Sequence, residues 1–86
     1  MSERIEQYTS LLEDENGVRY TVEAHGDTTS DGLWEGWLEF HPLEAEMPVL
    51  RTDRETTQPN RSALEYWATG LEPVYFEGAF ERAYVS

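Results

Sequence analysis

The chain contains no cysteine, so it has no disulfide bonds, no thiolate metal site and no cysteine nucleophile. It also contains no lysine, and all six of its basic residues are arginine. No apolar run reaches the length of a membrane span or of a signal-peptide core. These absences predict a cytoplasmic protein that does not contact a membrane.

Acidic residues are the unusual excess. Eighteen of them oppose the six arginines in a chain of 86 residues, which gives a net charge of −12. Such a charge repels phosphates, so direct binding to nucleic acid is disfavoured. Adaptation to a salty (halophilic) cytoplasm explains the excess, as does a surface that attracts a basic partner or imitates DNA. The acids are spread along the chain, which favours the first explanation.

Residues 33–42 alternate with a period of two, which is typical of a half-buried strand. The expected core side carries Trp34, Gly36, Leu38 and Phe40, and the expected outer side carries Glu35, Trp37, Glu39 and His41. Residues 18–25 alternate in the same way. We expect the loop 26–32 to close a hairpin between these strands, with Val18 opposite Phe40 and Tyr20 opposite Leu38.

Residues 5–13 fit either a helix face or a strand. The Asn16-Gly17 turn that follows favours a strand, with Leu12 opposite Thr21. Residues 49–53 suit a fourth strand, with Leu50 beside Phe40 and Arg51 opposite Glu39.

Two helices are expected after residue 56. The first begins near residue 60, with Asn60, Thr57 or a capping box at Ser62 as its start, and we expect Trp67 to cover Gly36. The second begins at Pro73, although residues 74–76 could form a short strand. We therefore predict a single α+β domain over residues 1–86, with residues 1–4 frayed. Its four-stranded antiparallel meander carries two C-terminal helices packed on one face.

No motif for chemistry is present. In the expected register the two histidines, His25 and His41, lie at opposite ends of one hairpin, roughly 26 Å apart. One metal ion cannot join side chains that far apart, so we predict no metal site. The chain has no metalloprotease motif, no phosphate-binding glycine loop and no nucleophile elbow. We predict no catalytic residue and no cofactor.

The expected outer face of the sheet offers a contact surface, because no helix is assigned to cover it. An aromatic patch with charges at its rim is typical of partner surfaces. We therefore favour a non-enzymatic interaction module that binds another protein or a second copy of itself. Alternatively, Trp37 lies flat on its neighbours or the chain's end folds over it. The predicted surface comprises Tyr8, Leu12, Arg19, Trp37 and Glu39.

A second hypothesis is a small-anion or phosphate site at the first helix's N-terminus, where free N–H groups and guanidinium groups meet. Its residues are Arg51, Arg54, Thr57, Asn60 and Arg61. The alternative is that Thr57 and Asn60 cap the helix while the arginines pair with nearby acids. A third hypothesis is an acidic mimic of nucleic acid, which requires the acids to gather on one face.

Residues 34–40 (Trp-Glu-Gly-Trp-Leu-Glu-Phe) and residues 51–60 (Arg-Thr-Asp-Arg-Glu-Thr-Thr-Gln-Pro-Asn) resemble strings in small uncharacterised bacterial proteins of about this length. The likeness covers most of the chain. That group carries no known activity, so the resemblance implies no function here.

Overall fold

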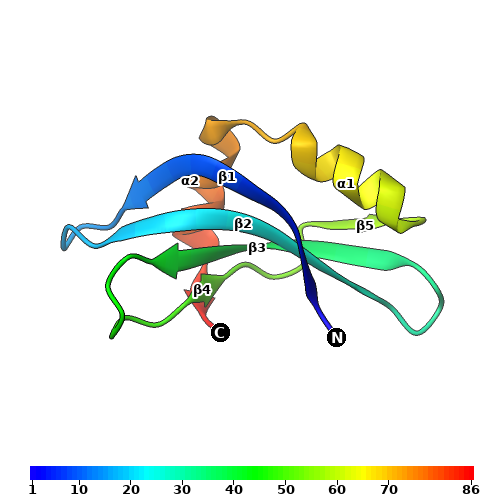
Figure 1. Ribbon diagram of the computed structural model, residues 1–86, viewed down its shortest axis with the longest axis horizontal. Helices are drawn as coiled ribbons and strands as arrows, with labels where there is room; N and C mark the ends of the chain where they lie inside the picture. Colours follow the sequence, from blue (N-terminus) through cyan, green and yellow to red (C-terminus); the bar gives the residue numbers. More distant parts are fainter.

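The computed structural model describes all 86 residues and belongs to the α+β class (Figure 1). Six strands form one antiparallel sheet in the order β1-β2-β3-β4-β6, and β5 pairs with β3. The elements are β1 (Glu3–Glu13), β2 (Arg19–Thr28), β3 (Trp34–Pro42), β4 (Leu50–Arg51), β5 (Thr56–Gln58), α1 (Arg61–Thr69), α2 (Pro73–Arg82) and β6 (Tyr84–Val85). The prediction of four strands was wrong, because β5 and β6 were missed. No helix is long and apolar enough to cross a bilayer.

The hairpin of β2 and β3 is tighter than the sequence suggested. Strand β2 continues to Thr28, and the turn is closed by the N–H of Thr29, which donates to the carbonyl of Leu33 at 2.7 Å. Gly32 provides the positive φ of 85° that the turn requires. Phe40 therefore pairs with Val22 instead of Val18, a shift of four residues in every predicted pair. Because the shift is even, the assignment of side chains to faces survives.

The turn between β1 and β2 is longer than a two-residue Asn-Gly turn. Asp14 accepts hydrogen bonds from the N–H groups of Asn16 and Val18, both at 2.9 Å, so that residues 14–18 form the loop. As a result Leu12 pairs with Tyr20 instead of Thr21. A shift of one residue moves a side chain to the other face of the sheet. Leu12 therefore packs against the core and not on the outer face.

The core lies between one face of the sheet and both helices. Val22, Ala24, Leu38 and Phe40 are fully buried there, together with residues of α1 and α2 such as Ala68 and Ala79. Gly26 and Gly36 pair across β2 and β3, and a Cβ on either would collide with Leu64, at 2.4 and 2.7 Å. Leu64 thus occupies most of the space above Gly36, where Trp67 was expected, and Trp67 lies beside it.

Several local predictions are confirmed. Asn60 caps α1 by accepting from the N–H of Ala63 at 2.8 Å, and Pro73 begins α2, so residues 74–76 are helical. Strand β4 has the expected register, with Arg51 opposite Glu39. Strands β4 and β5 both pair with β3, and between them the buried Thr52 hydroxyl accepts from the N–H of Leu38 at 3.1 Å.

Candidate functional site

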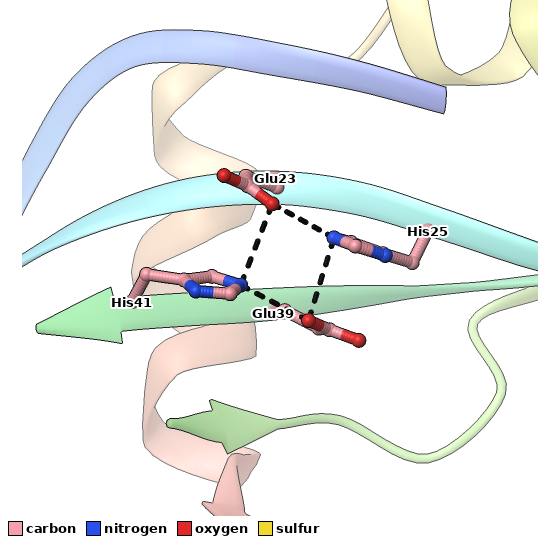
Figure 2. Close-up of side chains that lie close together, drawn as sticks. All are labelled: Glu23, His25, Glu39 and His41. Atoms are coloured by element: carbon pink, nitrogen blue, oxygen red, sulfur yellow. Dashed lines mark hydrogen bonds and ion pairs between the residues drawn. The ribbon is translucent and has the colours of Figure 1, made fainter. Parts of the chain in front are cut away.

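The outer face of the sheet carries a cluster of four metal-ligating side chains on neighbouring strands (Figure 2). Strand β2 contributes Glu23 and His25, and strand β3 contributes Glu39 and His41. Their neighbours in sequence, such as Ala24 and Phe40, point into the core, so strand alternation sends these four side chains to the opposite face. We call them the histidine–glutamate cluster.

The observed register brings these side chains together. Glu23 lies directly opposite Glu39, whereas the predicted hairpin placed it opposite Glu35. His25 and His41 flank this pair on opposite sides and lean toward each other, with ring centroids 6.0 Å apart. The predicted separation of the histidines was wrong, because β2 continues through Gly26 to Thr28 and the turn lies two residues further along the chain than expected.

The four ligand atoms form a closed ring of short contacts. Nε2 of His25 lies 2.8 Å from Oε1 of Glu23 and 3.4 Å from Oε1 of Glu39. Nε2 of His41 lies 3.4 Å and 3.0 Å from the same two oxygens. All four atoms lie within 4.8 Å of one another. One nitrogen from each histidine and one oxygen from each glutamate therefore face a common point.

The histidine–glutamate cluster is half-buried although no helix covers it. The exposed fraction of its side chains is 11% for Glu23, 14% for His25, 17% for Glu39 and 34% for His41. Two carboxylates held close together in such a place repel each other unless a cation or a proton stands between them. Arg4 on β1 approaches only the outward oxygen of Glu23, at 3.8 Å.

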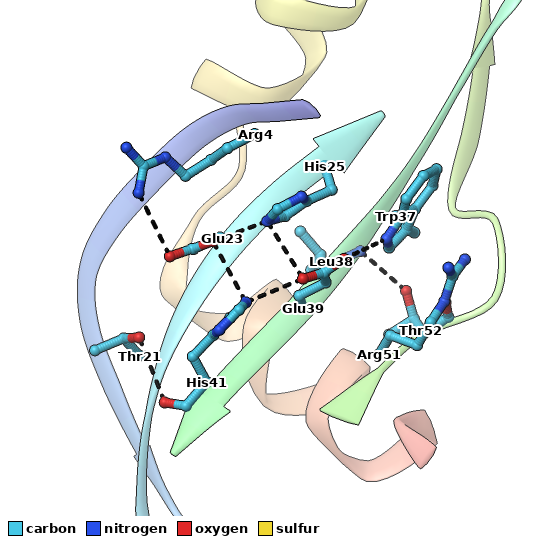
Figure 3. A network of polar contacts seen from close by, with 10 residues as sticks. All are labelled: Arg4, Thr21, Glu23, His25, Trp37, Leu38, Glu39, His41, Arg51 and Thr52. Atoms are coloured by element: carbon cyan, nitrogen blue, oxygen red, sulfur yellow. Dashed lines mark hydrogen bonds and ion pairs between the residues drawn. The ribbon is translucent and has the colours of Figure 1, made fainter. Parts of the chain in front are cut away.

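The outward oxygen of Glu39 is held by a different donor (Figure 3). The indole N–H of Trp37 donates to Oε2 of Glu39 at 3.0 Å. The guanidinium of Arg51 stacks on that indole, 4.3 Å from its centroid, and donates through Nε to the carbonyl of Thr52. Each carboxylate therefore turns Oε1 toward the histidines and Oε2 toward a donor outside the cluster.

Imidazole nitrogens and carboxylate oxygens are the ligands of zinc and of other divalent ions of the first transition row. Four ligands at about 2.0–2.1 Å from a tetrahedral ion stand roughly 3.4 Å from one another. The four histidine–glutamate contacts of 2.8–3.4 Å are close to that spacing, and the two remaining separations are at most 4.8 Å. The arrangement can therefore hold an ion of this size with small side-chain movements.

The structure disperses the predicted partner surface. Tyr8 packs against Phe76 on the core side, with ring centroids 4.5 Å apart, and its hydroxyl donates to the carbonyl of Ala68. Burial, with a smaller effect of Glu6, raises the pKa of Tyr8 well above its usual range. Arg19 is exposed and lies opposite Glu13 of β1 in the sheet.

Trp37 is on the outer face, as predicted, but only 5% of it is exposed. It lies flat beneath Arg51 and beside His25, which is the alternative that the sequence left open. Of the five residues predicted for the partner surface, only Trp37 and Glu39 lie together.

Several groups of the predicted anion site are engaged in contacts within the chain. Arg61 donates to Glu3 at 2.6 Å and to Glu65 at 2.7 Å, and Asn60 is occupied as the cap of α1. These contacts agree with the alternative interpretation, in which Asn60 caps the helix and the arginine pairs with nearby acids. Arg51, on β4, stacks on the indole of Trp37, while Arg54 and Thr57 are exposed.

The histidine–glutamate cluster was missed although the sequence carries a signal for it. The tripeptides Glu23-Ala-His25 and Glu39-Phe-His41 place glutamate and histidine on the same face of two adjacent strands. This pattern indicates a cluster as soon as the two glutamates are paired. The sequence analysis lacked only the pairing of Glu23 with Glu39.

Comparison of the chain with protein-family models, with curated proteins and with solved structures found no match.

Proposed function

We propose that this protein binds a divalent transition-metal ion, with zinc as the expected ion, in the histidine–glutamate cluster. The observation that carries the proposal is the convergence of two imidazole Nε2 atoms and two carboxylate Oε1 atoms on one point. Glu23, His25, Glu39 and His41 are the proposed ligands.

The charges in and around the cluster favour a cation. Two carboxylates and two neutral imidazoles carry a charge of −2, which a divalent ion balances. The next pair along the same strands and the same face, Asp27 and Glu35, adds further negative potential, as does the net charge of −12. The two imidazoles discriminate against calcium and magnesium, which prefer oxygen ligands.

The position of Arg51 also supports a ligand role for Glu39. Arg51 lies directly opposite Glu39 in the sheet, yet its guanidinium stacks on Trp37 and makes no ion pair with that carboxylate. Oε1 of Glu39 is directed instead toward His25 and His41. The carboxylate thus remains free to serve as a ligand.

Isothermal titration of chelator-treated protein with zinc chloride tests the proposal, with thermal unfolding as the second measurement. We expect one ion per chain. Zinc at one hundred times its dissociation constant stabilises the folded state by about 2.7 kcal/mol. For a domain of this size the melting temperature should rise by roughly 10–20 °C. Magnesium should produce no comparable shift.

Two variants separate a specific site from general attraction of cations to an acidic surface. His25→Gln removes one proposed ligand and should abolish most of the zinc-induced shift. Glu35→Gln removes one charge from the same face of the sheet, on β3, but no ligand, so it should retain the shift. Absence of zinc binding, or equal losses in both variants, would contradict the proposal.

The interaction module and the nucleic-acid mimic predicted from sequence stay predictions. The geometry favours metal binding over the interaction module, because the aromatic anchor proposed for it, Trp37, is buried under Arg51. A partner that needs the outer face would have to contact the rim of the cluster instead.

A further inference from the structure

We infer that Trp37 is a positioning residue for the metal ion, one that holds Glu39 in its ligating orientation through the indole N–H. The inference rests on the proposed zinc site and names a residue outside the four ligands. Its basis is the 3.0 Å hydrogen bond from Nε1 of Trp37 to Oε2 of Glu39 (Figure 3).

A free carboxylate can present either oxygen to a metal ion and can rotate about its last side-chain bond. The indole removes this freedom for Glu39, because it binds Oε2 and leaves Oε1 toward Nε2 of His41, 3.0 Å away. Hydrogen bonds of this kind, made to metal ligands by surrounding residues, set ligand orientation and metal affinity.

The indole is itself held in place from two sides. Arg51 covers one part of the ring at 4.3 Å, and His25 lies nearly parallel to it, with centroids 6.5 Å apart and planes 23° apart. Trp37 therefore touches one ligand by hydrogen bonding and lies beside a second ligand by stacking. Its burial at 5% exposure keeps water from competing for the N–H.

The two glutamates differ in this respect. Glu23 has only the long contact to the half-exposed Arg4, at 3.8 Å, on its outward oxygen. A contact of this length is not a hydrogen bond and contributes little to orientation. Glu39 is therefore the pre-oriented ligand of the cluster, and Trp37 is the reason.

Trp37→Phe tests the inference, because it keeps an aromatic ring and removes the N–H donor. We expect its affinity for zinc to fall roughly 10- to 100-fold, as for other losses of hydrogen bonds to metal ligands. The visible spectrum of bound cobalt(II) should also change, since it reports the geometry of the ligands. Trp34→Phe is the matched control: it lies on the same strand, opposite Thr28, and should leave both measurements unchanged.

A measurement on metal-free protein reads the contact separately from zinc binding. The side-chain carboxyl carbon of Glu39 should shift in the NMR spectrum of Trp37→Phe and not in that of Trp34→Phe. In the unaltered chain, the indole N–H signal of Trp37 should move on addition of zinc, whereas those of Trp34 and Trp67 should not. This last experiment needs no variant to fold.

The outcomes distinguish this inference from the proposed function. If the unaltered chain takes up zinc and Trp37→Phe binds it within twofold of that affinity, the positioning role is wrong and the metal site stands. If the unaltered chain takes up no zinc, both are overturned, even where the carboxyl shift confirms the hydrogen bond.

Discussion

Two of the places where ionisable side chains converge in this molecule are built differently. In the Glu55 contact, Arg82 and the hydroxyl of Tyr75 both donate to Oε1 of Glu55, the former at 2.7 Å. In the histidine–glutamate cluster, two carboxylates face two imidazoles. An arginine carries its charge at every accessible pH, whereas a histidine carries one only when protonated.

The pKa values at the Glu55 contact are those of a carboxylate whose charge is balanced by neighbouring donors. Burial alone would raise the pKa of Glu55, but the hydrogen bonds from Tyr75 and Arg82 outweigh it and lower the pKa. Burial and the bond to Glu55 raise the pKa of Tyr75 to about 12, so its hydroxyl remains a donor at neutral pH. Glu55 thus has a permanent cation from the chain beside it, whereas the inward oxygens of the two carboxylates in the cluster face only imidazoles.

The largest expected effect comes from removing the cation of the Glu55 contact. Arg82→Gln leaves a carboxylate whose side chain is only 9% exposed without its charged partner. We expect a loss of about 1–3 kcal/mol in the free energy of unfolding. Chemical denaturation measures it, and the loss should be the same with and without zinc. A loss that depended on zinc would show that the Glu55 contact and the histidine–glutamate cluster are not independent.

A smaller effect is expected from acid. Because the folded-state pKa of Glu55 lies below its ordinary value of 4.5, its stabilising contribution is present above pH 4.5 and is lost as the pH falls through the lowered pKa. The difference in unfolding free energy between the unaltered chain and Glu55→Gln should therefore shrink below pH 4.5. Denaturation midpoints across an acid series measure this. A difference independent of pH would contradict it.

The smallest effect on stability is expected from giving the histidine–glutamate cluster a permanent cation. His41→Arg supplies a guanidinium near Glu23 and Glu39, and we expect the metal-free protein to change by less than about 1 kcal/mol. The zinc-induced rise in melting temperature should nevertheless disappear, because guanidinium does not ligate zinc. Thermal unfolding with and without zinc checks both statements. A retained rise would show that His41 is not a ligand.

The faces of the central strands could be predicted from sequence, but their pairing could not. Alternation assigned Trp37, Glu39 and His41 to the outer face, and this was right because successive side chains of a strand point to opposite faces of the sheet. The strand partners depend on where the turn lies, and the composition of residues 26–32 did not indicate this. Gly26 looked like loop material, but it is a strand residue that admits Leu64.

The sequence failed to predict the candidate site for the same reason. The loop lies at residues 29–33 instead of 26–32, which moved the two strands by four residues relative to each other and turned two distant histidines into neighbours. In the β1 hairpin a shift of one residue carried Leu12 into the core. Of the three arginines proposed for an anion, Arg61 pairs with Glu3, which is distant in sequence, and with Glu65, which is one helical turn away.

The direct opposition of Glu23 and Glu39 in antiparallel strands has one more consequence. A local two-fold axis passes between them and exchanges the tripeptide Glu23-Ala-His25 with Glu39-Phe-His41. Half of the histidine–glutamate cluster is therefore a three-residue unit, and the other half is its symmetry mate. An antiparallel ribbon that pairs two such tripeptides at their glutamates would repeat this arrangement, and Trp37 and Arg4 are among the residues that make its two halves unequal here.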